Sequence, residues 1–471
     1  MRLGALTGSD EAAAVTGFAI DHRKVAPGTV FGAFRGTRFN GEDYIEQAIA
    51  SGAVAVVARP EAQVTGALHI AADEPRRAFA QLAARFFQPF PRIIAAVTGT
   101  NGKTSTVELA RQLWRMAGHP SASIGTLGVT TSDEQVTTGL TTPDIVTFLS
   151  NMAGLAKMGI THAAFEASSH GLDQYRTEGP KVQVAAFTNF SRDHLDYHET
   201  MDAYFEAKMR LFTEVVEPDG SVVVWADDAK SGEVIRRVRE PGLRLLTVGN
   251  AGETLRLVER GRTALGQTMI VEADGKRHKV TLNLIGAYQA ANALTAAGLV
   301  IAAGGDTAQT LTNLSRVHPV RGRLERAVIT RAGTPVYVDY AHTPDAIEAA
   351  IEALRPHTAN RLITVFGAGG DRDIGKRADM GAAAARLSDL VIVTDDNPRG
   401  EDPAAIRRDI LAGAPDAREV GGRREAIKAA IAEAGEGDII LLAGKGHEQG
   451  QIVGDRVLPF DDVTVARECA S

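Results

Sequence analysis

Hydrophobic and polar positions along this chain of 471 residues follow two alternating patterns. Short apolar runs are typical of buried strands, and segments with apolar residues three or four positions apart are typical of amphipathic helices. The run IIAAVTG (93–99), for example, is followed by the helical pattern TSTVELARQLWRMAG (104–118). This alternation recurs to the C-terminal region, and it predicts an α/β fold with parallel sheets covered on both faces.

The predicted elements come directly from this patterning. Strands are expected at 28–36, 52–60, 93–99, 162–168, 184–190, 221–226, 243–249, 336–341, 362–370, 390–396 and 439–446. Helices are expected at 41–52, 74–87, 104–118, 287–304, 344–356 and 376–387. Residues 269–284 have the pattern of a β-hairpin whose turn is Asp274-Gly275.

The length favours about three domains at about 150 residues each. We expect an N-terminal domain (1–89), a central domain (90–318) with a phosphate-loop type of parallel sheet, and a C-terminal Rossmann-like domain (319–471). Pro89 and Pro91 favour a hinge at the first boundary.

Composition narrows the class of protein. With 44% hydrophobic and 23% charged residues the chain can bury a large core, and its net charge of −7 gives no basic field for nucleic acid. One cysteine, Cys469, excludes an intramolecular disulfide and a cysteine-based zinc cluster, and it fits a reducing compartment. The first residues lack a signal-peptide core, and no run reaches the ~18 apolar residues of a membrane span. We therefore expect a cytoplasmic protein without membrane insertion or nucleic-acid partner, and a monomer because no feature indicates an interface.

The segment AVTGTNGKTST (96–106) is the strongest local motif. It lies between a predicted strand and a predicted helix, where backbone N–H groups and a lysine can bind phosphates. The usual spacing would place the first glycine at position 97, which is Val97, so the loop is a shortened version. No Asn-Lys-x-Asp guanine motif follows, which favours ATP over GTP. The loop residues are Gly99, Thr100, Asn101, Gly102, Lys103, Thr104 and Ser105.

Two further segments carry candidate chemistry. Glu166 ends a predicted strand, where a carboxylate can bind Mg²⁺, and His194 follows the next predicted strand between two aspartates. Lys208 lies among Tyr204, Phe205 and Leu211 at helical spacing, which by itself predicts a surface lysine on an amphipathic helix.

Taken together, these segments resemble the Mur ligase family, ATP-dependent enzymes that add amino acids to the peptide of the bacterial cell-wall precursor. The resemblance covers nearly the whole chain and rests on TGTNGKTST, EASSHGLDQYR, NFSRDHLDYH, GRLE and DYAHTPDA. It implies ATP and Mg²⁺ as cofactors and UDP-N-acetylmuramoyl-L-alanyl-D-glutamate as substrate.

The resemblance also implies roles for single residues. Lys103, Glu166, His194 and Lys208 match catalytic positions, with Lys208 as a carbamate, and the metal would be held by Thr104, Glu166, His194 and that carbamate. Contacts to the nucleotide are implied for Asn292, Arg323 and Asp339 in addition to the phosphate loop. Contacts to the muramoyl peptide are implied for Thr141, Thr142, Ser168, Gln174 and Arg176.

The N-terminal domain departs from the family pattern. The family holds the uridine with Asp-Ser-Arg, where this chain has Asp21-His22-Arg23, and with a later His-Gln-Ala, where it has 37–39 as Thr-Arg-Phe. His22 is the residue carried over as a contact to the UDP-linked substrate.

Three predicted strands of the C-terminal domain end in polar loops, and ligands of open α/β sheets bind beyond the carboxyl ends of strands. The motif DNPR (396–399) matches family members that add meso-diaminopimelate. An arginine can bind the distal carboxylate of that substrate through two hydrogen bonds, and an acid such as Glu448 can bind its ammonium. The candidate residues are Arg372, Asp396, Asn397, Pro398, Arg399, Gly444 and Glu448.

Other functions stay open at this point. A homologue that adds L-lysine is one alternative, and DNPR counts against it. A ligase similar to folylpolyglutamate synthetase shares the core fold, and both DNPR and the first 90 residues count against it. A further alternative is a regulator with a phosphate loop that binds ATP but joins no substrates. A non-enzymatic binding module is the last alternative.

Overall fold

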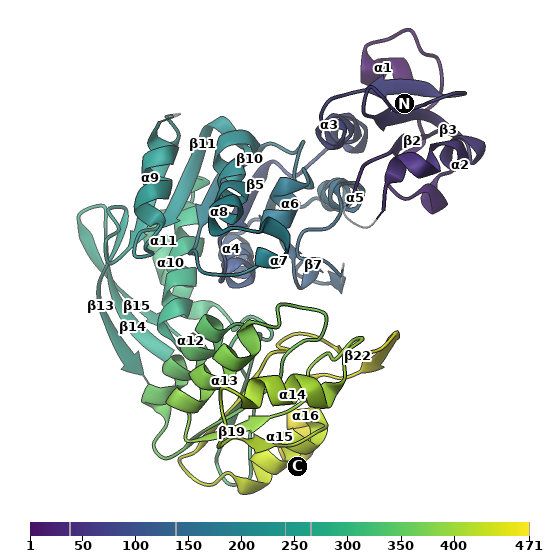
Figure 1. The fold of residues 1–471 in the computed structure, drawn as a ribbon. Coiled ribbons are helices and arrows are strands. Elements are labelled where there is room, and N and C mark those ends of the chain that lie inside the picture. The colour runs from purple at the N-terminus through teal and green to yellow at the C-terminus, as the bar shows by residue number, and fades with distance from the viewer. Residues whose placement is uncertain (37–38, 137–138, 241, 264–265, 471) are drawn as a thin grey trace.

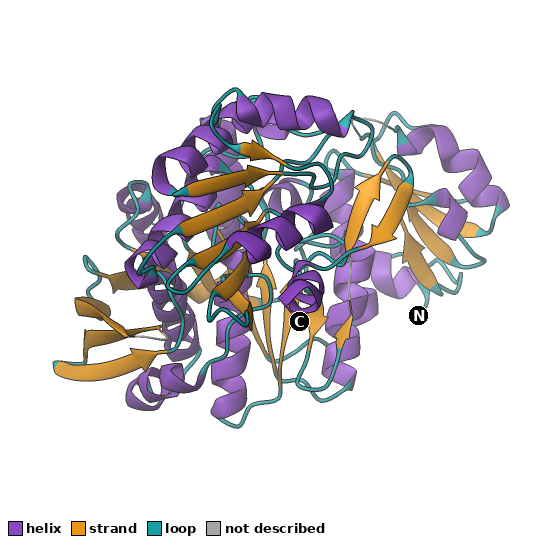
Figure 2. Ribbon diagram, turned by 90° about the horizontal axis from the view of Figure 1, so that it is seen from below, coloured by secondary structure: helices purple, strands orange, loops and turns teal. Residues whose placement is uncertain are grey.

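The computed structural model describes residues 1–36, 39–136, 139–240, 242–263 and 266–470. Its main sheets follow one another along the chain, and helices cover them (Figures 1 and 2). This architecture confirms the predicted α/β class with parallel sheets. The domain boundaries at 89/90 and 318/319 stay predictions.

A small parallel sheet with strand order β1-β2-β3-β4 forms the N-terminal part. Its strands are β1 (Gly17–Ala19), β2 (Thr29–Gly32), β3 (Ala53–Ala58) and β4 (Leu68–Ala71). Its helices are α1 (Leu3–Thr7), α2 (Ile45–Ala50), α3 (Pro75–Phe87) and the 3-10 turns η1 (His22–Lys24) and η2 (Gly41–Tyr44). The predicted helix at 41–52 is therefore split, because its first turn is a 3-10 helix capped by Asn40.

The central sheet has the order β15-β14-β13-β12-β11-β10-β5-β9-β6-β7-β8 and is parallel from β13 to β6. Its strands are β5 (Ile93–Thr98), β6 (Ser121–Gly125), β7 (Gly128–Thr130), β8 (Gln135–Val136), β9 (His162–Glu166), β10 (Val182–Phe187), β11 (Val216–Trp225), β12 (Arg244–Gly249), β13 (Leu255–Thr263), β14 (Gly266–Ala273) and β15 (Lys276–Leu282). The helices are α4 (Lys103–Met116), α5 (Ile145–Lys157), α6 (Ser169–Asp173), α7 (Leu195–His198), α8 (Met201–Arg210), the π-turn η3 (Leu211–Val215), α9 (Ser231–Arg239), α10 (Ala287–Ala302), α11 (Thr307–Asn313) and η4 (Leu314–Arg316).

The predicted hairpin at 269–284 is confirmed as β14 and β15, and Asp274 and Gly275 at its turn have φ of 48° and 71°. The strand β13, which the sequence did not reveal, pairs antiparallel with β14 and joins this hairpin to the central sheet.

Helices on both faces explain why the central strands are mostly apolar on both sides. Ile94 and Ala96 of β5 belong to a core shared with α3, α5 and α8. Ala95 and Val97 face the opposite side and pack with α4 and α10. The first of these cores also contains residues of the N-terminal sheet, so the two parts share one hydrophobic cluster.

The C-terminal sheet has the order β16-β17-β21-β18-β19-β20, with only β16 antiparallel to its neighbour. Its strands are β16 (Glu325–Ile329), β17 (Pro335–Asp339), β18 (Leu362–Phe366), β19 (Leu390–Val393), β20 (Arg418–Glu419) and β21 (Ile439–Ala443), and β22 (Gly450–Val453) and β23 (Arg456–Pro459) form a separate hairpin. Its helices are α12 (Pro344–Leu354), η5 (Arg355–His357), α13 (Lys376–Leu387), α14 (Pro403–Leu411), α15 (Arg423–Glu433) and α16 (Asp462–Ala470).

Candidate active site

The loop of residues 99–102 joins β5 to α4 and can be built only with glycine at two of its positions. Gly99 and Gly102 have φ of 141° and 85°. A Cβ at Gly99 would lie 2.0 Å from Thr188 Oγ1, and a Cβ at Gly102 would lie 2.3 Å from Asn292 Oδ1. The first turn of the following helix leaves its N–H groups without intrahelical acceptors. Such an arrangement of loop and helix start suits the binding of an anion.

Two lysine side chains meet at the carbonyl oxygen of Gly99. Lys103 Nζ donates to it at 2.9 Å and Lys208 Nζ donates to it at 2.8 Å. Lys208 is 1% exposed, so the surface position expected from its helical spacing is wrong. Burial lowers the pKa of Lys208 well below its ordinary value, and the charge of Lys103 lowers it further. Since two cations on one carbonyl repel each other, Lys208 fits this place as a neutral amine or as an anionic derivative.

Glu166 ends β9 beside the phosphate loop and is 2% exposed. Its Oε1 accepts a hydrogen bond from Thr126 N at 2.7 Å, and its Oε2 accepts one from Thr126 Oγ1 at 3.1 Å. Burial raises the pKa of Glu166, while the charge of Lys103 and the Thr104 hydroxyl act in the opposite direction. The carboxylate thus lies in a dry site that favours a cationic neighbour.

His194 occupies a left-handed backbone position with φ of 53° at the start of α7. Its Nε2 lies 3.5 Å from Asp193 Oδ2, and its ring packs edge-on against His170 at 4.8 Å. Burial lowers the pKa of His194 to about 4, and the charges of Lys103 and Lys208 contribute in the same direction. The ring is therefore neutral near pH 7 and can act as a metal ligand.

The residues predicted to hold the muramoyl peptide form one hydrogen-bonded network. Thr142 Oγ1 donates to the Glu166 carbonyl oxygen at 2.7 Å and lies 2.9 Å from Ser168 Oγ. Arg176 donates to the Thr142 carbonyl oxygen at 3.0 Å and to Gln174 Oε1 at 2.7 Å. Thr141 Oγ1 lies 3.1 Å from the Thr126 hydroxyl that also contacts Glu166. The tertiary structure thus joins this network directly to the acid beside the phosphate loop.

The C-terminal part contacts the phosphate loop through Arg323. Its Nη2 donates to Thr104 Oγ1 at 3.0 Å, and its guanidinium lies 4.5 Å from the ring centroid of Tyr340. Asp339 Oδ2 accepts from Leu324 N at 2.6 Å, next to Arg323 in the chain, and burial raises the pKa of Asp339 to about 6. Asn292 of α10 reaches the same place, beside Gly102. The predicted nucleotide residues are therefore gathered together, although they come from the central and the C-terminal parts.

The loops after β18, β19 and β21 converge, as the strand-end argument predicted. Arg399, with φ of 51°, donates from Nη1 to the Gly370 carbonyl oxygen at 2.7 Å. Asn397 Nδ2 donates to Glu448 Oε2 at 2.7 Å. Gly444 has φ of 110°, and a Cβ there would lie 2.5 Å from Asp396 Oδ2.

The candidate amino-acid-binding residues of this region differ in their solvent exposure. Arg372 is exposed and follows the Gly369-Gly370 turn, while Pro398 is buried between Asn397 and Arg399. Asp396 is 8% exposed and its Oδ2 lies 3.9 Å from the buried Arg423. Asp396 therefore has a cation of the protein itself as its neighbour.

His22 lies apart from these groups in η1 of the N-terminal part. Its ring stacks on Tyr44 with centroids 4.2 Å apart and planes within 3°. Asp21 and Arg23 form an ion pair with each other at 2.8 Å. Of the segment 37–39, the positions Thr37 and Arg38 lie outside the described residues.

Several residues of the site were not found from the sequence. Thr126 follows β6 and binds both Glu166 and Thr141, and the rule that polar residues gather after parallel strands could have indicated it. Lys445 lies within the Gly-Lys-Gly turn after β21 and was overlooked between Gly444 and Glu448.

The residues around Glu166 fit a divalent cation by their chemistry. Among the described residues no group of three or more His, Cys, Asp or Glu side chains is arranged for a metal. Only two of the predicted metal ligands, Glu166 and His194, are of these four residue types. The other two would be the Thr104 hydroxyl and the Lys208 carbamate. Thr104 and Glu166 supply hard oxygen atoms in a buried place next to the phosphate loop, which suits Mg²⁺.

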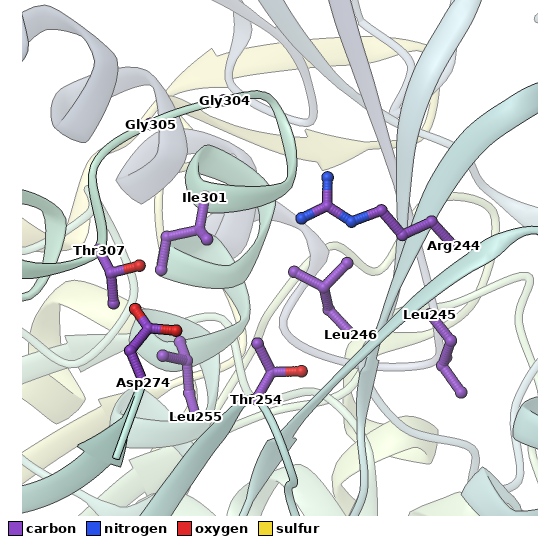
Figure 3. A pocket seen from close by; sticks show the side chains of 10 residues that line it. All are labelled: Arg244, Leu245, Leu246, Thr254, Leu255, Asp274, Ile301, Gly304, Gly305 and Thr307. Carbon is purple, nitrogen blue, oxygen red and sulfur yellow. The ribbon is translucent and has the colours of Figure 1, made fainter. Parts of the chain in front are cut away.

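A pocket of about 410 Å³ lies elsewhere, between β12, the β14–β15 turn and the end of α10 (Figure 3). Its polar side chains are Arg244, Thr254, Asp274 and Thr307, and no predicted site residue lines it. In the part of the chain that the structure describes, no helix is long and apolar enough to cross a membrane.

Comparisons with known proteins identify the family of this chain. Three family models match, described as "Mur ligase family, catalytic domain" over 14–94, "Mur ligase middle domain" over 97–300 and "Mur ligase, glutamate ligase domain" over 322–446. A relative from Zymomonas mobilis named UDP-N-acetylmuramoyl-L-alanyl-D-glutamate–2,6-diaminopimelate ligase is 61% identical, covering 96% of this chain and 94% of its own.

Solved structures give the same result. A structure of a UDP-N-acetylmuramoyl-L-alanyl-D-glutamate–2,6-diaminopimelate ligase is 32% identical with a TM-score of 0.73, covering 100% of this chain and 98% of its own. Mycobacterium tuberculosis folylpolyglutamate synthase complexed with ADP shares the fold at 20% identity and a TM-score of 0.65, covering 79% of this chain and 91% of its own. The sequence matches, the shortened phosphate loop and the converging strand-end loops together show that this chain belongs to the Mur ligase family.

Proposed function

We propose that the protein is an ATP-dependent amide ligase that joins meso-diaminopimelate to the D-glutamate of UDP-N-acetylmuramoyl-L-alanyl-D-glutamate. The observation that carries this proposal is the contact of Arg323 with Thr104. This contact connects the C-terminal part, whose strand-end loops would bind the amino acid, to the phosphate loop of the central sheet. The 61% identity to a relative with this name supports the choice of substrates.

ATP would bind through the phosphate loop and the residues gathered around it. The N–H groups of the first turn of α4 would donate hydrogen bonds to the phosphates, and Lys103 would neutralise their charge. Asn292, Arg323 and Asp339 would contact the nucleotide from the two sides of the loop. In this proposal the direct ATP contacts are Gly99, Thr100, Asn101, Gly102, Lys103, Thr104, Ser105, Asn292, Arg323 and Asp339.

Lys208 would act as its carbamate. A neutral amine attacks CO₂, and the low pKa of the buried Lys208 provides that neutral form. The N–C bond forms as one C=O π bond of CO₂ opens onto its oxygen, one proton leaves the nitrogen, and the neutral amine beside Lys103 becomes an anion. Repulsion at the Gly99 carbonyl is thereby replaced by attraction, which explains why a lysine is tolerated there.

Mg²⁺ would be held by Thr104, Glu166, His194 and the carbamate of Lys208. When bound, it supplies positive charge that screens the phosphates from an approaching carboxylate. The chain's own contribution is to hold these atoms beside the phosphate loop, where Thr104 and Glu166 are buried and Thr126 fixes Glu166. His194 would reach the metal from a side chain that is 42% exposed.

The muramoyl dipeptide would lie along the network of Thr141, Thr142, Ser168, Gln174 and Arg176, with His22 on the uridine side. This network ends at Glu166, so the D-glutamate carboxylate would reach the γ-phosphate. Its oxygen attacks the γ-phosphorus and ADP leaves, which gives an acyl phosphate. The amine then attacks the acyl carbon, loses a proton and expels phosphate, and positioning and charge neutralisation supply most of the catalysis.

The incoming amino acid would be bound by Arg372, Asp396, Asn397, Pro398, Arg399, Gly444 and Glu448. Arg399 would bind the distal carboxylate and Glu448 the distal ammonium. Asp396 and Pro398 would shape the loop, since Asp396 already faces Arg423. L-Lysine lacks the distal carboxylate, and a site built for a polar group rejects such an analogue by up to about 10⁴–10⁵-fold.

One assay tests this function. The protein is mixed with ATP, Mg²⁺ and UDP-muramoyl dipeptide, and either meso-diaminopimelate or L-lysine is added. We expect tripeptide product and phosphate release with diaminopimelate and almost none with lysine. Product with lysine alone would overturn the specificity, and phosphate release that needs neither substrate would indicate a regulator instead of a ligase. Gel filtration tests the expected monomeric state. We further propose that the protein acts in the cytoplasm, where ATP is available, and that it has no nucleic-acid partner.

A further inference from the structure

Lys445 is a buried cation in the loop after β21, among the residues proposed to bind the amino acid. No role has yet been given to it. It follows Gly444 at the end of β21 and is 0% exposed. The next residue, Gly446, has φ of 55°, and a Cβ there would lie 2.6 Å from Tyr340 Cβ. Both neighbours are thus held in conformations that favour glycine, which fixes the backbone from which Lys445 extends.

The ammonium of Lys445 binds two residues of the proposed amino-acid subsite. Its Nζ donates to Asn397 Oδ1 at 3.1 Å and to Glu448 Oε2 at 3.0 Å. Asn397 Nδ2 also donates to Glu448 Oε2 at 2.7 Å, and Asn397 Oδ1 accepts from Ile452 N at 2.9 Å. Lys445 therefore ties the loop after β19 to the loop after β21.

This arrangement leaves the two oxygens of Glu448 unequal. Oε2 accepts two hydrogen bonds from the protein, whereas Oε1 has no hydrogen-bond partner among the described residues. The Glu448 side chain is 28% exposed, while Lys445 is fully covered. A carboxylate held by one oxygen presents the other in a fixed direction to a ligand.

We propose that Lys445 is a positioning residue of the amino-acid subsite. It holds Glu448 so that the free Oε1 of Glu448 meets the distal ammonium of the incoming amino acid. The inference rests on the proposed function and deepens it. Lys445 itself does not touch the substrate, because it is buried behind Glu448 and Asn397. Its role is to orient the acid and to prevent that acid from turning toward the buried Arg423.

A double-mutant cycle tests this role, with Lys445→Met, Glu448→Gln and the double variant. The measured quantities are the KM for meso-diaminopimelate, the KM for ATP and for UDP-muramoyl dipeptide, and the thermal midpoint. We expect Lys445→Met to raise the KM for diaminopimelate about tenfold to hundredfold, the range for losing a charge-assisted hydrogen bond. The other two KM values should change less than about twofold, and the double variant should be no worse than the more affected single variant.

Three outcomes would each overturn the proposal: additive effects in the double variant, an unchanged KM for diaminopimelate, or an equal rise of all three KM values. If Lys445→Met does not fold, Lys445→Gln keeps a polar group of similar length, and the same selective loss is expected of it. Lys428→Met is the matched control, since Lys428 is exposed on α15. A wild-type enzyme that forms no product with diaminopimelate would refute the proposed function instead, which separates the two failures.

Discussion

Lys103 Nζ and Lys208 Nζ both donate to the carbonyl oxygen of Gly99, at 2.9 and 2.8 Å. Two full positive charges so close together, and both away from water, would repel strongly. Carbamylation of Lys208 removes this conflict, because it replaces one cation with an anion beside the other.

Activity should therefore depend on dissolved CO₂. Removing CO₂ and bicarbonate should lower the rate of phosphate release, and adding bicarbonate should restore it. Lys208→Ala should lose about 10²- to 10³-fold in kcat, as for other removed charge-stabilising groups, and short-chain carboxylates should restore part of it. Lys230→Ala is the control, because Lys230 pairs with Glu233 outside the site. Equal activity with and without bicarbonate, and no recovery with carboxylates, would contradict the carbamate.

Gly102 should not tolerate a side chain. Its φ of 85° already costs an alanine about 1–2 kcal/mol, and a Cβ would lie 2.3 Å from Asn292 Oδ1. Gly102→Ala should abolish ATP binding, measured by calorimetry, in addition to lowering the thermal midpoint. Gly118→Ala at the other end of α4 is the control, since Gly118 has φ of 87° but open space around it. If both variants lost ATP affinity alike, backbone strain and not the contact would be responsible.

Arg399→Ala should raise the KM for diaminopimelate by about 10²-fold or more and leave ATP affinity nearly unchanged. The reason is that its guanidinium is placed by the Gly370 carbonyl and is the proposed partner of the distal carboxylate. Steady-state kinetics with each substrate varied in turn measures the effect, and the exposed Arg408→Ala is the control. An equal fall in ATP affinity would mean that Arg399 has some other role.

His162 should make the protein less stable in acid. Burial lowers the pKa of His162 to about 4, against an ordinary value of 6.5. Between these values the unfolded chain binds more protons than the folded one, so stability rises with pH across this window and falls as pH drops from 6.5 to 4. His162 is 4% exposed and packs against Trp114, so His162→Phe keeps the contact and removes the titration.

Denaturant unfolding between pH 4 and 7 checks this prediction. The wild type should lose up to about 3 kcal/mol more than His162→Phe across the window. Curves of the two proteins that stay parallel would show that His162 does not titrate in this way.

Much of this protein is determined locally and could be predicted from its sequence. Strand and helix patterning arises from neighbouring residues, so the α/β class and most of the predicted elements were correct. The phosphate loop was also predictable, because Gly99 and Gly102 serve a turn whose geometry is local. Strand ends bring polar loops to one edge of a parallel sheet, so Asn397, Arg399 and Glu448 could be expected to converge.

Only the tertiary structure decided which side chains are buried together. Helical spacing placed Lys208 at the surface, but the packing of α8 against the phosphate loop buries it. Arg323 reaches Thr104 across 219 positions of sequence, and Lys445 binds Asn397 across 48. The physical reason is that desolvation and charge pairing depend on distances in space, which periodicity along one chain does not contain.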